Sequence, residues 1–92
     1  MTDPALRDDQ AIRSGITRFI MERFAEGSRP GTIQDGTKLM GGTLLDSMSM
    51  LELTVYLEET YTLTIAAEEI TAGNFGTVGS LVRFVAGRLA AG

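Results

Sequence analysis

The 92-residue chain contains neither cysteine nor histidine. Without cysteine it forms no disulfide and offers no thiolate to a metal, and without histidine it lacks the commonest zinc ligand. A domain of this size is near the lower limit at which a single hydrophobic core suffices without such cross-links. Apolar packing must therefore hold the fold, and a hydrophobic content of 43% with only two prolines favours a folded helical domain over disorder.

Long apolar runs and a basic leader are also missing. No apolar stretch approaches the ~20 residues that a membrane span requires. The first ten residues, MTDPALRDDQ, do not resemble a secretory signal. We therefore expect a cytoplasmic protein that does not enter a membrane.

Basic residues are absent from the middle of the chain. No lysine or arginine lies between Lys38 and Arg83, and we expect the field of the acids in that interval to be locally unopposed. Such a segment repels nucleic acid and anionic lipid, because binding to either depends on cationic groups. A basic protein partner is one interpretation, and a solvated helix face kept soluble by its charge is the other. The acids are Asp46, Glu52, Glu58, Glu59, Glu68 and Glu69.

Apolar residues at helical spacing predict a first helix over residues 4–25. Asp3 would cap this helix, and Pro4 suits its first position. Gly15 costs such a helix about 1 kcal/mol relative to alanine, which leaves close packing and simple tolerance as alternatives. The buried stripe is expected to contain Ile12, Ile16, Phe19, Ile20 and Phe24.

Residues 27–46 are rich in turn formers and predict a long loop. Its apolar anchors are Ile33, Leu39, Met40, Leu44 and Leu45. Loops of this length are uncommon without secondary structure of their own, so a short helical turn is expected within it.

A second helix is predicted from about Ser47 to Thr60. Ser49 and Glu52 stand at the spacing of a capping box, which assigns the cap to Ser49 and leaves Ser47 without a local role. The helix has two apolar faces. One is a core face with Met50, Leu53, Leu57 and Tyr61, and the other exposes Met48, Leu51 and Val55 near Glu52, Glu58 and Glu59.

The last third of the chain predicts one short and one long helix. A single helical turn is expected over Ala66 to Ile70, ended by Gly73, and Thr77 is expected to cap a final helix. That helix would bury Val78, Leu81, Val82, Val85 and Leu89. The fold class expected is all-α, a small four-helix bundle of three long helices and one short one, with a long loop between the first and second helices.

Ser47 has no evident base to activate it as a nucleophile. The usual base is histidine, and Lys38, the only lysine, would have to reach across the loop. Neighbouring acids such as Glu58 and Glu59 face different ways on a helix and make poor acid–base pairs. We therefore expect no enzymatic activity. Another enzyme can still modify an exposed hydroxyl at a helix start, where the helix dipole favours an attached phosphate.

The stretch LLDSMSMLELTVYLEE resembles the attachment motif of the acyl carrier protein superfamily, in which an Asp-Ser-Leu or Asp-Ser-Met triplet precedes an acidic recognition helix. The resemblance extends over about residues 44–86, through LTI, the Glu68–Glu69 pair and NFGTVGSLVRFV. It implies one carrier-protein domain over residues 1–92 and 4'-phosphopantetheine attached covalently to Ser47. It also implies that Asp46 assists the transferase and its metal, and that the cofactor's thiol holds the cargo as a thioester.

The resemblance also implies partners. They are a phosphopantetheinyl transferase, a cargo-loading ligase or acyltransferase, and downstream biosynthetic enzymes. The carrier itself is expected to be a monomer. The partner-binding residues implied on the second helix are Met48, Leu51, Glu52, Val55, Glu58 and Glu59.

The cargo stays open between an aminoacyl group and an acyl or polyketide chain. Ser49 stands where many fatty-acid carriers have an acid, and GNFGTV resembles carriers of specialised pathways and of amino-acid loading systems. The alternative function is a helical adaptor without a covalent group, which binds a basic protein through its acidic second helix.

Overall fold

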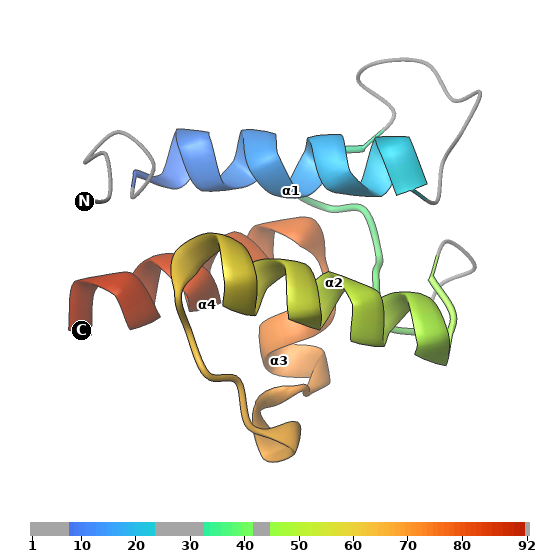
Figure 1. Ribbon diagram of the computed structural model, residues 1–92. Helices are drawn as coiled ribbons and strands as arrows, with labels where there is room; N and C mark the ends of the chain where they lie inside the picture. The colour runs from blue at the N-terminus through green and yellow to red at the C-terminus, as the bar shows by residue number, and fades with distance from the viewer. Residues whose placement is uncertain (1–7, 24–32, 42–44, 92) are drawn as a thin grey trace.

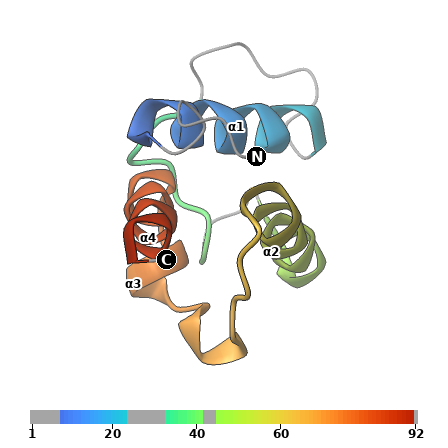
Figure 2. The same ribbon diagram turned by 60° about the vertical axis from the view of Figure 1, so that its left-hand side comes forward.

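The computed structural model describes residues 8–23, 33–41 and 45–91. Its helices are α1 (Asp9–Arg23), α2 (Ser47–Tyr61), α3 (Ala72–Phe75) and α4 (Val78–Ala91), with a 3-10 turn η2 (Ala67–Glu69) before α3. In Figures 1 and 2, α1 lies over α2 and α4, and η2 lies on the side of the bundle away from α1. The described residues contain one isolated antiparallel bridge, Lys38 with Thr77, and no strand. The predicted fold class is confirmed.

Three buried stripes follow the predicted helical periodicity. Ile12, Ile16 and Ile20 of α1 are buried, as are Leu53, Leu57 and Tyr61 of α2. The stripe predicted for α4 is also confirmed, and it consists of Val78, Leu81, Val82, Val85 and Leu89. The same core also contains Phe75 of α3 and four residues outside the helices, Ile33, Leu39, Leu45 and Ile65.

The first helix begins at Asp9, later than the predicted residue 4, and Asp8 Oδ1 accepts a hydrogen bond from Ala11 N (2.8 Å) at its start. A carboxylate satisfies the free N–H groups of a first helical turn, so Asp8 takes the capping role that was predicted for Asp3. Asp3, Pro4, Phe24 and Leu44 themselves lie outside the described residues.

Gly15 lies at a close contact between α1 and α2. A methyl group at this position would lie 2.8 Å from the hydroxyl of Tyr56 and 3.2 Å from that of Tyr61. The ring of Tyr56 is stacked on Phe19 of α1, with centroids 4.3 Å apart and planes at 15°. Of the two interpretations of Gly15, close packing is therefore the right one.

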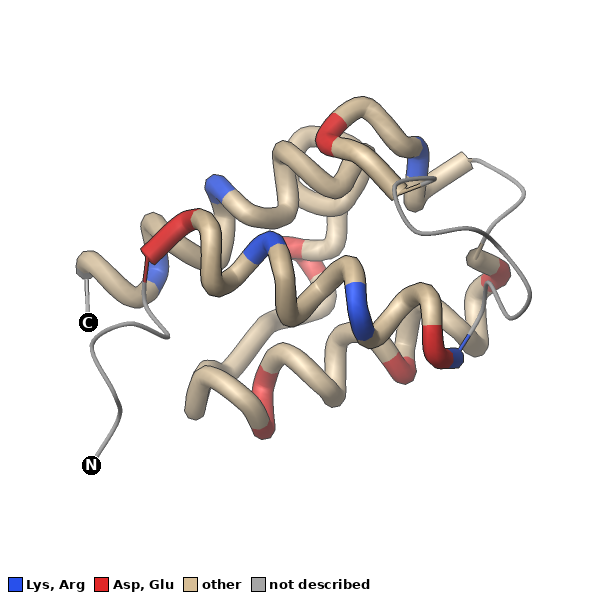
Figure 3. Tube along the Cα trace, turned by 90° about the horizontal axis from the view of Figure 1, so that it is seen from above, with Lys and Arg blue, Asp and Glu red and all other residues tan. Residues whose placement is uncertain are grey.

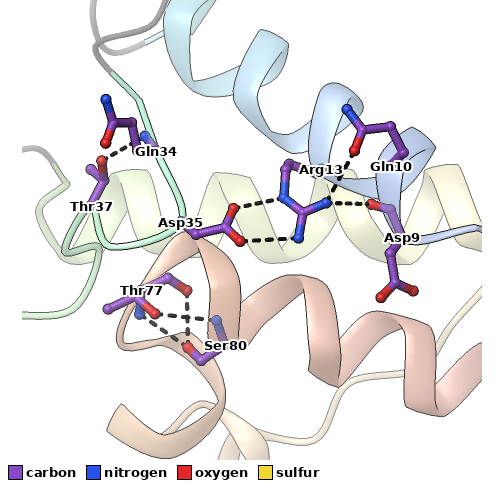
Figure 4. A network of polar contacts seen from close by, with 8 residues as sticks. All are labelled: Asp9, Gln10, Arg13, Gln34, Asp35, Thr37, Thr77 and Ser80. Carbon is purple, nitrogen blue, oxygen red and sulfur yellow. Dashed lines mark hydrogen bonds and ion pairs between the residues drawn. The ribbon is translucent and has the colours of Figure 1, made fainter.

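The described part of the loop between α1 and α2 is tied to α1 and to the start of α4. Asp35 accepts hydrogen bonds from Arg13 Nε (2.6 Å) and Nη2 (3.0 Å), and its backbone carbonyl accepts one from Gly79 N (2.8 Å). The paired guanidinium of Arg13 holds the pKa of Asp35 below its ordinary value. Thr77 Oγ1 accepts from Ser80 N (3.1 Å), which confirms Thr77 as the cap of α4. Figure 4 shows the contacts of Arg13 with Asp35 and of Thr77 with Ser80.

The short helical turn does not end as predicted. The turn over Ala67–Glu69 is a 3-10 turn, and Gly73 lies inside a further helix, α3, rather than ending the first one. Thr71 caps α3 by accepting from Asn74 N (3.3 Å), while the Asn74 amide donates to the carbonyl of Glu69 (2.9 Å). Glycine disfavours a helix by about 1 kcal/mol. The complete burial of Phe75, the last residue of α3, outweighs that cost.

Candidate functional site

Ser47 is the first residue of α2, and the residue that caps this helix is Asp46. Asp46 has the extended backbone typical of a cap (φ −95°, ψ −174°), and its Oδ1 accepts a hydrogen bond from Ser49 N (2.8 Å). The prediction that Ser49 caps the helix is therefore wrong. A charged carboxylate accepts a backbone N–H more strongly than a hydroxyl does, so the helix begins at the earlier position.

The cap also affects the ionisation of Asp46. Hydrogen bonding from the backbone N–H of Ser49, aided by its side chain, holds the pKa of Asp46 below the ordinary value for an aspartate. Asp46 therefore remains a carboxylate at neutral pH beside the hydroxyl of Ser47. Its place as a helix cap gives it a structural role, and its help to a transferase stays a prediction.

We expect the free energy of unfolding to fall as the pH is lowered through the native pKa of Asp46. Because the folded pKa lies below that of the unfolded chain, which is about 4, this stabilisation is complete above the unfolded value and is lost as the pH falls through the folded one. Asp46→Asn keeps a capping oxygen but does not titrate.

Urea midpoints measured at a series of pH values should fall less steeply in Asp46→Asn than in the wild type. Asp35 and Glu69, whose pKa values are also lowered, by the Arg13 hydrogen bond and by the Ala66 backbone N–H respectively, contribute to the slope in both proteins. If the urea midpoint fell equally steeply with decreasing pH in both proteins, a charged cap at Asp46 would be contradicted.

The Ser47 side chain is exposed, and its hydroxyl makes no hydrogen bond to the described residues. Lys38 is also exposed, and its backbone pairs with Thr77 at the start of α4. Within the described ranges no group of three or more acidic side chains could hold a metal ion. Ser47 is thus placed as a group that a second protein can reach.

A hollow of about 490 Å³ lies beside Ser47. It is formed by the described end of the loop, the first turns of α2 and the residue that follows η2. Most of its side chains are apolar, and Asp46 and Ser47 are the polar ones. The lining residues are Leu39, Met40, Gly41, Leu45, Asp46, Ser47, Met50, Leu51 and Ile70. An apolar group linked to Ser47 would therefore have an apolar surface within reach.

The face of α2 predicted to be exposed is exposed. Met48, Leu51 and Val55 are accessible over 66%, 56% and 43% of their surfaces, and they are the large hydrophobic residues exposed among those described. Glu52 and Glu59 are exposed near them. Apolar side chains exposed together are typical of a contact surface for another molecule. Their role in partner binding stays a prediction.

Glu58 differs from the other two acids of α2. It is half-buried, and its Oε2 accepts a hydrogen bond from the backbone N–H of Ile65 (2.9 Å). Its carbonyl accepts from Leu63 N (3.1 Å). Glu58 thus connects the end of α2 to residues 63–65 through hydrogen bonds. A change of its charge would therefore disturb the fold as well as any docking surface.

A second hollow, of about 540 Å³, lies between α1 and α2. It is lined by Phe19 and Arg23 from α1 and by Leu51, Glu52, Val55, Tyr56, Glu59 and Thr60 from α2. Arg23 therefore shares this hollow with two acids of α2, and Figure 3 shows the charged positions of both helices. The expectation of a locally unopposed acidic field is wrong, because it considered neighbours along the chain and not neighbours in space.

Sequence reasoning missed the contribution of α1 to this surface. The sequence pattern places Phe19 in the buried stripe of the first helix. It does not indicate Arg23 as a residue that binds a partner. Arg23 lies over the Phe19 ring, with its guanidinium carbon 5.4 Å from the centroid. No local pattern signals that these residues stand beside α2, because their position depends on how the two helices pack.

Comparison of the chain with protein-family models and with curated proteins finds no match. None of the helices described here is both long enough and apolar enough to cross a membrane.

Proposed function

We propose that this protein is a discrete carrier that holds an acyl or aminoacyl group on a 4'-phosphopantetheine arm attached to Ser47. One observation carries the proposal: the Ser47 hydroxyl is exposed at the first residue of α2, directly after the capping Asp46. The motif around Ser47 resembles the attachment motif of acyl carrier proteins. The exposed residues Met48, Leu51 and Val55 supply the adjoining surface on which enzymes would dock.

The residues present fit such a group. Ser47 offers an accessible oxygen for a phosphodiester, and the amino end of α2 favours the negative charge that the phosphodiester carries. The attached group would supply a terminal thiol, which this chain lacks because it has no cysteine. The hollow beside Ser47 supplies apolar side chains along which the first part of an arm or its cargo can lie.

Modification would join Ser47 Oγ to the phosphorus of a phosphopantetheine donor such as coenzyme A. The bond broken is the one between that phosphorus and the bridging oxygen of the donor's remaining phosphate, which leaves. We assign the base that takes the Ser47 proton to the transferase, because this chain has no histidine and the Asp46 carboxylate already accepts Ser49 N. A cargo-loading ligase or acyltransferase and downstream enzymes would then act on the thiol.

Intact mass spectrometry tests this proposal. After coexpression with a broad-specificity phosphopantetheinyl transferase, the wild type should gain the mass of one phosphopantetheine and Ser47→Ala should gain none. Ser49→Ala is the matched control, because it removes a neighbouring hydroxyl and keeps the backbone N–H that Asp46 accepts. An unmodified wild type, or a modified Ser47→Ala, would refute the attachment site.

A second candidate function rests on the exposed apolar residues of α2 together with Glu52 and Glu59. A helical adaptor could bind a basic partner with this surface and need no covalent group. Wild type and Ser47→Ala would then bind that partner equally, whereas a carrier's downstream enzymes would respond only to modified protein.

A further inference from the structure

Arg88 of α4 holds the segment between α2 and α3. Its Nη1 donates to both carboxylate oxygens of Glu69 in η2, at 3.0 and 2.9 Å, and its Nη2 donates to the backbone carbonyl of Thr64 (2.8 Å). Glu69 Oε1 also accepts a hydrogen bond from the backbone N–H of Ala66 (2.9 Å). One guanidinium thus connects α4 to two points of residues 62–71, which form no α-helix.

The place of Arg88 is itself set by aromatic packing. Its guanidinium carbon lies 5.8 Å from the centroid of the Phe84 ring, one turn earlier on α4, and Phe84 packs against the buried Phe75 of α3. The side chains of Arg88 and Glu69 are 33% and 32% exposed, so water screens the pair and its contribution to stability is small. Its contribution to geometry is larger, because a guanidinium that bonds both carboxylate oxygens and a carbonyl fixes position and orientation together.

The residue that Glu69 places is Ile70. Ile70 follows Glu69 directly, and its N–H donates to the carbonyl of Ala67 (3.1 Å) at the end of η2. Ile70 is half-buried and lines the hollow beside Ser47, whereas every other lining residue given for this hollow belongs to residues 39–51. Ile70 therefore forms a wall of the hollow that a distant part of the chain supplies.

We propose that Arg88 is a positioning residue for the hollow beside Ser47, and that through Glu69 and Ile70 it limits the size of the apolar group that this hollow accepts. With the pair intact, η2 is held to α4 and Ile70 keeps one place in the lining. With the pair broken, η2 and Ile70 can move away from Ser47, and the hollow then accepts a longer group. Only the consequence for an acyl cargo rests on the proposed carrier function.

The remaining contacts of η2 explain why this change should not unfold the protein. The side-chain amide of Asn74 donates to the carbonyl of Glu69 (2.9 Å), and Phe75 keeps α3 in the core. Loss of the Arg88 contacts should therefore displace the wall without removing α3. The size limit of the hollow and the stability of the fold can consequently be measured as separate quantities.

Ser47→Cys allows a test that needs no transferase. The chain has no cysteine, so the introduced thiol is the only one, and it stands at a residue that lines the hollow. Alkyl methanethiosulfonates from ethyl to decyl are attached to it one at a time. The thiolate displaces methanesulfinate, an S–S bond joins the alkyl chain to the protein, and intact mass confirms that attachment is complete.

With Arg88 intact, Tm should rise by about 3–6 °C for each methylene group that becomes fully buried, and should stop rising at a limiting chain length. The resonance of the Ile70 δ1 methyl group should shift over the same range of lengths. In Arg88→Gln the rise should continue to longer chains. The backbone order parameter of Ile70 should also fall, from the rigid value of about 0.85 towards about 0.6.

Two further variants separate positioning from other effects. Glu69→Gln removes the charge but keeps an oxygen for Ala66 N, and it should extend the limiting length as Arg88→Gln does. It supplies the same measurement if Arg88→Gln does not fold. Arg83→Gln, which removes an exposed charge from the same helix, is the matched control and should leave the limit unchanged.

Either of two results would overturn the proposal. One is the same limiting length in the protein with Arg88 intact and in each folded variant, with an unchanged Ile70 resonance, which would leave the pair a role in η2 alone. The other is a Tm that does not depend on chain length in any variant, which would show that groups at position 47 do not enter the hollow. Neither result bears on the modification of Ser47, because the mass measurement tests it separately.

Discussion

Replacement of Phe75 by alanine is expected to lower the free energy of unfolding by about 3–5 kcal/mol. Phe75 is fully buried, and it packs against Phe84 of α4, with ring centroids 5.6 Å apart. Truncation would remove most of the apolar area that α3 buries and leave a cavity between α3 and α4. Domains of this size have total stabilities of about 5–15 kcal/mol, so this one change should remove a large part of the total.

The loss should be visible in urea and thermal unfolding, with a fall in Tm of about 4–8 °C for each kcal/mol. Gly73→Ala is the matched control on α3, because the new methyl group would make only an ordinary contact, 3.7 Å from Thr71 Oγ1. It should leave stability unchanged or raise it slightly through helix propensity. A cost below about 1 kcal/mol for Phe75→Ala would mean that α3 does not pack as described.

Leu53→Ala is expected to cost about 2–5 kcal/mol, whereas Leu51→Ala, two positions away on α2, should cost no more than about 1 kcal/mol. Leu53 is fully buried and Leu51 is 56% exposed. The two substitutions remove the same atoms from the same helix, so the difference between them measures burial alone. Each free energy of unfolding can be obtained from urea melts of the purified variants.

If Leu51→Ala proved as destabilising as Leu53→Ala, the assignment of two faces to α2 would be wrong. If instead Leu51→Ala folds normally, any loss of partner binding in this variant can be attributed to the docking surface and not to unfolding. Leu51 lines both the hollow beside Ser47 and the hollow between α1 and α2. Its truncation should therefore weaken the binding of any enzyme that docks beside Ser47.

The sequence by itself was enough to predict the three long helices and most of their buried faces. The stripe Ile12, Ile16 and Ile20 in α1 and the apolar residues of α4 repeat at helical spacing, which is a local property of the chain. The exposed face of α2 followed from the same periodicity. The junction at Ser47 was also predicted, although its cap was assigned to the wrong residue.

Only the tertiary structure decided which residues from separate segments meet. Gly15 lies against Tyr56, Arg23 shares a hollow with Glu52, and α3 forms around a buried phenylalanine despite its internal glycine. Helical periodicity tells which face of a helix is buried but not which helix covers it or at what height. These contacts depend on the packing of whole helices, so no local pattern in the sequence could have predicted them.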